Sequence, residues 1–199
     1  MLSFSQPTDR QKRLFSVACC KRVWHLMTDP RSRNALEVVE LFADGKATKQ
    51  ELKTAHAAYA ADAAADAAAH AAYTANAAAD AADAAAYAAA DAADNAAAYA
   101  AYAAANAAPA KGLNWNESYN QERQTQAELL RDIVNPFFKT TTTFNAEIKN
   151  LAEQVYQTQQ DHQILADYLE EHYDEPVLLR HLRQPNHQKG CWAVDLARV

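Results

Sequence analysis

Six side chains of the types that ligate zinc lie near the two ends of the sequence. They are Cys19, Cys20, His25, His181, His187 and Cys191. Thiolate sulfur and imidazole nitrogen are the usual ligands of structural zinc. The spacing matches a zinc motif only weakly, because adjacent cysteines on a helix point about 100° apart and cannot easily share one ion. We therefore expect no metal and expect Cys20 and Trp24 to be core residues. A cysteine-based metal or redox module is the alternative.

Acid–base catalysis is the second chemistry that the residue types allow. His25, His70 and the aspartates from Asp62 to Asp94 are groups that accept and donate protons. The aspartates lie in a segment that we expect to be one long helix, which presents them on a convex surface and not in a cleft. The sequence also lacks a glycine-rich phosphate loop, a GxSxG motif and an HExxH motif. We expect no enzyme, no catalytic or cofactor-binding residues, no cofactor and no small-molecule substrate.

Charge is unevenly placed along the 199 residues. The net charge of −6 equals that of the six aspartates in residues 57–108, a segment without lysine or arginine. Such an acidic segment would repel phosphates and is too polar to cross a bilayer, so neither nucleic acid nor membrane is an expected partner. Three cysteines, two of them adjacent, do not make a disulfide framework. The first residues show no signal-peptide pattern, so the expected location is the cytoplasm.

The elements that must position these side chains all read as helices, so the expected fold class is all-α. A first helix over residues 9–27 is followed by Asp29-Pro30, which is typical of a helix start, and Gly45 is typical of a helix end. The run Thr48–Glu51 has the capping-box pattern. A further helix through Leu129, Leu130 and Ile133 is expected to end before Asn135. Shorter helices are expected over about 145–157, 162–172, 176–183 and 191–198. The expected parts are an N-terminal helical pair (1–47), one very long helix (48–110) and a C-terminal helical module packing with the pair (111–199).

The long helix is the dominant feature of the sequence, with 36 alanines among the 52 residues 57–108. It has no glycine or proline to break it, and at ~1.5 Å per residue its roughly 60 residues give a coiled-coil-like rod of about 90 Å. A fold-back near Asp94-Asn95 is the alternative. On a helical wheel the polar residues share one half, including a heptad-like stripe of Tyr59, Asp66, Tyr73, Asp80, Tyr87 and Asp94, with Tyr102 further along.

The other half of this wheel is alanine from end to end and includes Ala78, Ala85 and Ala89. An apolar strip of this length is rarely left exposed on a soluble monomer. We expect it to form a helix–helix interface in a homo-oligomer, with the Tyr/Asp stripe setting the register. A solvated spacer is the plainer interpretation, because alanine is the best helix former.

The flanking segments resemble an uncharacterised protein family common in large-genome planctomycete-type bacteria. The stretch Arg13–Gly45 is similar to their RLF-x-x-ACCRR-x-W-H opening, "ELLRDIVNPF" (Glu128–Phe137) to their LLRDIFGNPF motif, and "KGCWAVDL" (Lys189–Leu196) to their RGCWVVDLLL ending. The resemblance covers roughly 100 residues and implies two flanking modules around a variable alanine-rich helix, with no assigned activity. Where the relatives read H-C-R, this chain reads His181-Leu182-Arg183, which argues against a metal that needs that cysteine.

These observations favour a non-enzymatic structural or self-assembly protein that works through surfaces. Two alternatives stay open. One is an ice- or surface-binding alanine-rich helix, although Thr74 is the only threonine of residues 57–108. The other is the cysteine-based metal or redox module.

Overall fold

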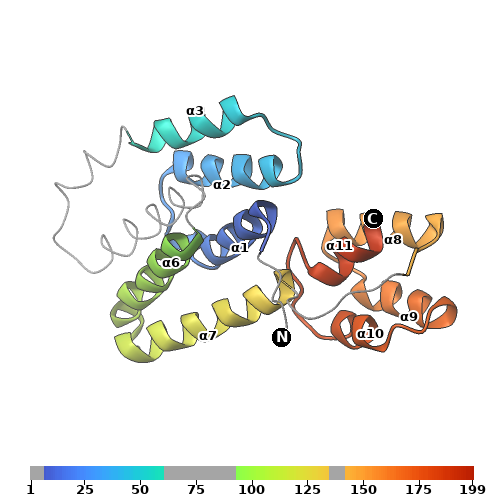
Figure 1. Ribbon diagram of the computed structural model, residues 1–199. Helices are drawn as coiled ribbons and strands as arrows, with labels where there is room; N and C mark the ends of the chain where they lie inside the picture. Colours follow the sequence, from blue (N-terminus) through green and yellow to red (C-terminus); the bar gives the residue numbers. More distant parts are fainter. Residues whose placement is uncertain (1–6, 61–92, 135–141) are drawn as a thin grey trace, which may run out of the picture. The chain divides into compact units, whose positions relative to one another are not determined.

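The computed structural model describes residues 7–60, 93–134 and 142–199 (Figure 1). These residues form α-helices and short 3-10 turns without any strand, which confirms the all-α class. The α-helices are α1 (Asp9–Arg22), α2 (Pro30–Ala43), α3 (Lys49–Ala60), α6 (Ala93–Ala107), α7 (Trp115–Ile133), α8 (Ala146–Thr158), α9 (His162–His172), α10 (Pro176–Leu182) and α11 (Trp192–Arg198). The 3-10 turns are η1 (Trp24–Leu26) and η2 (Pro109–Lys111). None of the described helices is long and apolar enough to span a bilayer.

The chain divides into two compact units, residues 8–128 and residues 129–199. The boundaries that the sequence predicts lie at residues 47 and 110. The first unit contains α1, α2, α3, α6 and most of α7, and the second contains the last turn of α7 and the helices α8 to α11.

Local signals define the helix ends where the sequence predicts them. The Asp29 carboxylate accepts a hydrogen bond from the Arg31 backbone N–H at 2.8 Å, with Pro30 as the first residue of α2. Thr48 and Glu51 form the reciprocal capping box before α3. At the end of α2, Gly45 has φ +70° and the Lys46 N–H donates to the Leu41 carbonyl, which is a Schellman motif.

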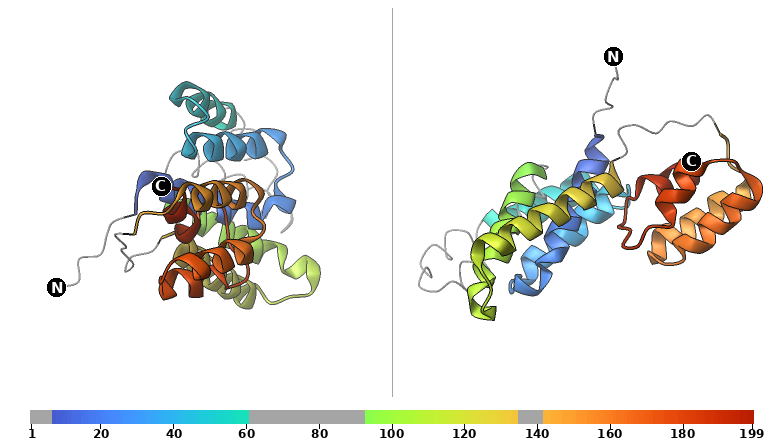
Figure 2. Two further views of the ribbon diagram at one scale, coloured as in Figure 1. Left: turned by 90° about the vertical axis from the view of Figure 1, so that its right-hand side faces the viewer. Right: turned by 90° about the horizontal axis from the view of Figure 1, so that it is seen from below.

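The two described ends of the alanine-rich segment are separate helices with different partners. Helix α3 packs against α2, α2 against α1, and α1 against α6, and α2 lies between α3 and α1 in both figures (Figures 1 and 2). Most of the rod expected over residues 48–110 lies outside the described residues, so the continuous helix stays a prediction. The longest described helix is α7, with 19 residues.

The alanine face of α6 is covered by the chain itself. Ala96, Ala100, Ala101, Ala103 and Ala105 are all completely buried, and α6 packs against α1. Small side chains allow two helix axes to approach closely, so this stretch of alanine serves an intramolecular contact. The predicted interface residues Ala78, Ala85 and Ala89 lie outside the described residues.

The Tyr/Asp stripe can be followed only at its last residue, Tyr102. Tyr102 is 41 % exposed, and its ring lies 5.4 Å from that of Tyr119 and 6.3 Å from that of Trp115, measured between ring centroids. Tyr102 therefore contacts aromatic rings of its own chain. The remaining stripe residues lie outside the described residues or side chains, namely Tyr59, Asp66, Tyr73, Asp80, Tyr87 and Asp94.

The second unit has its own hydrophobic core. Helix α8 packs against α9 and α11, and α10 packs against α9 and α11. Ile148, Leu165, Leu169 and Leu178 are completely buried in this core, and Tyr156 is 1 % exposed. The resulting frame fixes the end of α10, the loop that follows it and the start of α11, which are the segments that carry the site described next.

Candidate metal centre

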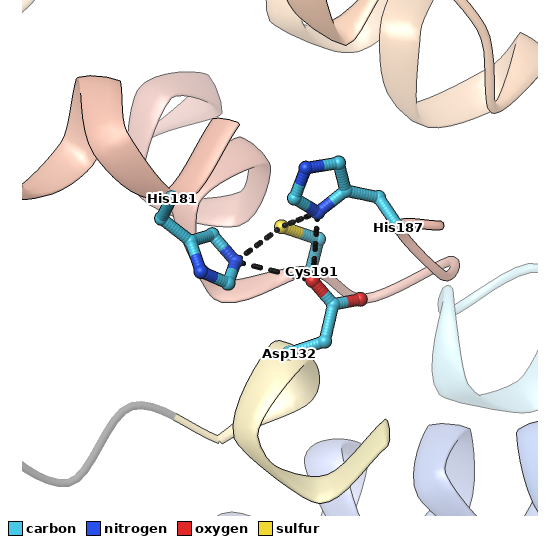
Figure 3. A group of neighbouring side chains, drawn as sticks. All are labelled: Asp132, His181, His187 and Cys191. Atoms are coloured by element: carbon cyan, nitrogen blue, oxygen red, sulfur yellow. Dashed lines mark hydrogen bonds and ion pairs between the residues drawn. The ribbon is translucent and has the colours of Figure 1, made fainter. Parts of the chain in front are cut away.

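Four side chains that can ligate a metal converge in the second unit (Figure 3). Asp132 comes from the last turn of α7, His181 from α10, His187 from the loop after α10, and Cys191 is the N-cap residue of α11. The candidate ligand atoms, one from each residue, all lie within 4.8 Å of one another. The four residues span positions 132 to 191, so the fold and not a local motif brings them together.

The spacing of these atoms is close to that of a tetrahedral zinc site. Cys191 Sγ lies 3.3 Å from His181 Nε2 and 3.5 Å from His187 Nδ1. Asp132 Oδ1 lies 3.1 Å from His181 Nε2 and 2.7 Å from His187 Nδ1. Zinc bonds of about 2.0–2.3 Å put neighbouring ligand atoms of a tetrahedron roughly 3.3–3.6 Å apart. The sulfur–nitrogen distances fall in this range, and the nitrogen–oxygen distances are somewhat shorter.

The hydrogen bonds of His187 determine which nitrogen faces the cluster. Its Nε2 lies 3.2 Å from the Leu182 carbonyl oxygen, which can only accept, so Nε2–H donates to it. In the neutral ring, Nδ1 then carries a lone pair that points at Asp132 Oδ1, another acceptor. Two acceptors at 2.7 Å require a cation or an additional proton between them. A backbone carbonyl that orients the far nitrogen is also the usual outer partner of a metal-ligating histidine.

Asp132 is a largely buried carboxylate without a lysine or arginine partner among the described residues. Its side chain is 12 % exposed. Burial by itself would raise its pKa, but the contacts with the His181 and His187 rings and the hydrogen bond from the Gln188 backbone N–H hold the pKa well below the usual range. The Gln188 bond goes to Oδ2 at 2.7 Å and leaves Oδ1 for the cluster. A charged carboxylate is thus oriented by the backbone toward two imidazoles and a thiol.

Cys191 is held by the start of α11 with its sulfur inside the cluster. It is 1 % exposed, and burial, with the Asp132 charge adding to it, raises the pKa of the thiol well above its usual value. The backbone N–H groups of Ala193 and Val194 donate to the sulfur and act in the opposite direction. Without a cation the sulfur is a neutral thiol, whereas a bound metal would stabilise the thiolate.

Three of the six residues that the sequence singled out as possible ligands belong to this cluster: His181, His187 and Cys191. The other three lie in the first unit, where Cys19 and Cys20 are completely buried and His25 is exposed. The core position expected for Cys20 is confirmed. Trp24 is only half-buried, at the start of η1, where its ring packs under the Arg33 guanidinium. His70 lies outside the described residues.

Sequence reasoning missed the fourth residue of the cluster, Asp132, although the residue lies within the quoted stretch Glu128–Phe137. Its relation to His181 is visible only in three dimensions. Leu182, which stands where the resembling family has cysteine, does not point into the cluster. Its side chain is buried in the core, and only its backbone carbonyl contacts His187.

Comparison of the chain with protein-family models, with curated proteins and with solved structures finds no match.

Proposed function

We propose that residues 129–199 form a zinc-binding helical module. Its ligands are Asp132 Oδ1, His181 Nε2, His187 Nδ1 and Cys191 Sγ. The observation that carries the proposal is the convergence of two imidazole nitrogens, a carboxylate oxygen and a buried sulfur within 4.8 Å of one another. A cation at the centre of the four atoms satisfies all of them at once.

The ligand set selects zinc among the common metals. Calcium and magnesium prefer oxygen ligands, so two imidazoles and a sulfur disfavour them. Two histidines and a cysteine also occur in blue-copper sites, but there the fourth ligand is long and weak. Here the fourth ligand is a carboxylate oxygen that lies closer to the two nitrogens than the sulfur does. Four ligands at similar distances favour a tetrahedral ion such as zinc.

The role that we propose for this zinc is structural. Four side chains of the chain complete a tetrahedron, and catalytic zinc keeps one position open for water or substrate. The ion would link the last turn of α7 to α10, to the following loop and to the start of α11. This role agrees with the non-enzymatic function expected from the sequence.

Metal analysis of the full-length protein tests the proposal. We expect one zinc per chain after purification, removed by a strong chelator and restored by added zinc. Cobalt in place of zinc should give the visible bands of a tetrahedral ion and a sulfur-to-cobalt charge-transfer band, which Cys191→Ser abolishes. Asp132→Asn and His187→Gln should weaken zinc binding by about tenfold or more, with circular dichroism confirming the fold of each variant.

Matched controls come from exposed residues of the same types. His25→Gln and Asp174→Asn should leave zinc affinity unchanged, since both residues are exposed and lie outside the cluster. A folded native protein that takes up no zinc, or ligand variants that bind zinc as tightly as the controls, would refute the site. A strongly preferred copper ion with a blue absorption would replace zinc in the proposal.

Self-association through Ala78, Ala85 and Ala89 stays a prediction, because these residues lie outside the described part of the chain. Light scattering on the native protein and on a variant with glutamate at these three positions tests it. A native protein that is already monomeric contradicts it.

A further inference from the structure

The two histidines of the proposed zinc site are held in place by different means. The far nitrogen of His187, Nε2, donates a hydrogen bond to the Leu182 carbonyl. His181 presents its Nε2 to the cluster, and the residues that the structure describes give its far nitrogen, Nδ1, no hydrogen-bond partner. A metal-ligating histidine usually has an outer partner that fixes the orientation of its ring. The orientation of His181 therefore depends on the rings that it contacts.

The indole ring of Trp192 is the nearest of these contacts. Its centroid lies 4.7 Å from the centroid of the His181 ring, with 37° between the ring planes. The His187 ring is the second contact, at 5.0 Å and 62°. The His181 side chain is only 13 % exposed, so little room is left for its ring to turn. Trp192 thereby limits the directions in which His181 Nε2 can point.

The position of Trp192 in the chain connects this contact to a second ligand. Trp192 is the first residue of α11 and directly follows Cys191, the N-cap residue of that helix. The side chain of Trp192 is half-buried and packs against the hydrophobic core of the second unit. One short segment thus carries the sulfur ligand and the ring that contacts the ligand on α10.

The indole ring also offers an interaction that depends on the ion. An imidazole that coordinates a metal ion becomes more positive. Aromatic faces attract positive charge, and among the aromatic side chains tryptophan does so most strongly. We propose that Trp192 is a positioning residue of the zinc site, which orients His181 for binding and stabilises its imidazole when the ion is bound. This inference rests on the proposed zinc site and adds to it a residue that is not itself a ligand.

His187 has a similar ring contact but depends on it less. The His162 ring stacks on the His187 ring, with centroids 4.5 Å apart. The hydrogen bond to the Leu182 carbonyl fixes the same His187 ring independently. Loss of the His162 ring should therefore weaken zinc binding less than loss of the Trp192 ring. A purely structural role of the two rings would change stability without this order in zinc affinity.

Zinc competition with a chromophoric chelator and cobalt spectra, both on the full-length protein, test the proposal. Trp192→Met removes the ring, and it should weaken zinc binding by about three- to tenfold and change the splitting of the tetrahedral cobalt bands. Trp192→Phe keeps a ring and should lose about twofold in zinc affinity, with cobalt bands close to the native ones. His162→Ala should lose less zinc affinity than Trp192→Met.

Leu196→Ala is the matched control, because Leu196 packs against the same core from the same helix. It should lower the thermal midpoint and leave zinc affinity and the cobalt bands unchanged. Native zinc affinity and native cobalt bands in Trp192→Met would show that Trp192 is merely structural and overturn the proposal. If Trp192→Met does not fold, native zinc affinity in Trp192→Phe overturns it.

The same measurements separate this inference from the zinc site on which it rests. A native protein that binds no zinc refutes the site and the role of Trp192 together. A native protein that binds zinc, with Trp192 variants that bind it equally well, refutes the role of Trp192 alone.

Discussion

Arg22 and Glu122 form a two-point ion pair inside the first unit. Arg22 Nε donates to both carboxylate oxygens of Glu122, at 2.8 and 2.9 Å, and so ties the last turn of α1 to the middle of α7. The Glu122 side chain is 7 % exposed and the Arg22 side chain 37 %. The carboxylate therefore depends on this cation more than the guanidinium depends on the carboxylate.

Replacing Arg22 should lower the free energy of unfolding more than neutralising Glu122. Arg22→Met leaves a buried carboxylate behind and should lower the free energy of unfolding by about 2 kcal/mol, which is below the value for a fully buried pair because Arg22 is partly in water. Glu122→Gln should cost less, since the amide still accepts a hydrogen bond. Urea unfolding of both variants and of the double variant measures the difference. Equal costs for the two single variants would contradict this account.

Gly45 should resist substitution although space surrounds it. Its φ is +70°, and no atom lies within 4 Å of the position that a Cβ would take. Gly45→Ala should therefore lower the free energy of unfolding by about 1 kcal/mol through backbone conformation alone. Gly45→Asn should cost less, because asparagine tolerates the left-handed region better. Denaturant unfolding of the two variants shows which one loses more stability. A Gly45→Ala variant as stable as the native protein would contradict the conformational explanation.

The cysteines of α1 should make the fold sensitive to alkali. Burial raises the pKa of the Cys19 and Cys20 thiols far above the usual value, with the Glu122 charge adding to the effect at Cys19. A raised folded-state pKa means that stability is fully present below the unfolded value of about 8.5 and falls as the pH rises above it. Cys20→Ala should flatten this fall in unfolding experiments between neutral and alkaline pH.

The same burial predicts the reactivity of these thiols. In the folded protein, a thiol reagent should modify Cys19 and Cys20 only as fast as the protein unfolds, because the thiolate fraction and the access are both small. Rapid modification of either residue in the native state, seen by mass spectrometry, would show that α1 opens locally.

Metal removal should destabilise the protein in a way that depends on zinc concentration. At a free zinc concentration 100 times the dissociation constant, binding to the folded state alone adds about 2.7 kcal/mol. The thermal midpoint should therefore rise with added zinc in the native protein and stay constant in Cys191→Ser. A midpoint that is independent of zinc in the native protein would argue against the ion.

The contact between α6 and α1 should tolerate small side chains only. Ala100 is completely buried and Ala104 is half-buried on the same helix. Ala100→Leu should overpack the contact and cost about 1–3 kcal/mol, while Ala104→Leu should be nearly neutral. Equal stability of the two variants, measured by thermal unfolding, would show that the contact is not closely packed at Ala100.

Much of the fold follows from local signals in the sequence. The starts of α2 and α3, the end of α2 and the span of α9 were all predictable, because capping residues, proline and glycine act within a few positions of themselves. The partner of α6 was not, since alanine favours a helix in every context and carries no signal that selects what the helix packs against. The packing of α6 against α1 is a tertiary contact between residues far apart in the sequence.

The candidate metal centre shows the same limit. His181, His187 and Cys191 lie within one stretch of the sequence and could be suspected from their types. Asp132 could not, because aspartate is a common surface residue and this one lies 49 positions before His181. Only the arrangement of α7 and α10 brings this helix-terminal carboxylate into the cluster.

The separation of Asp132 and Cys191 along the chain has a consequence for the unfolded state. An ion held by both residues acts as a cross-link that closes a loop of roughly 60 residues, and the chain-entropy model assigns such a closure about 4 kcal/mol. The zinc would then limit the unfolded ensemble as a disulfide does. A helical unit of about 70 residues is near the size at which a single core gives only marginal stability. The zinc would supply such a unit with a reversible cross-link that needs no oxidising environment.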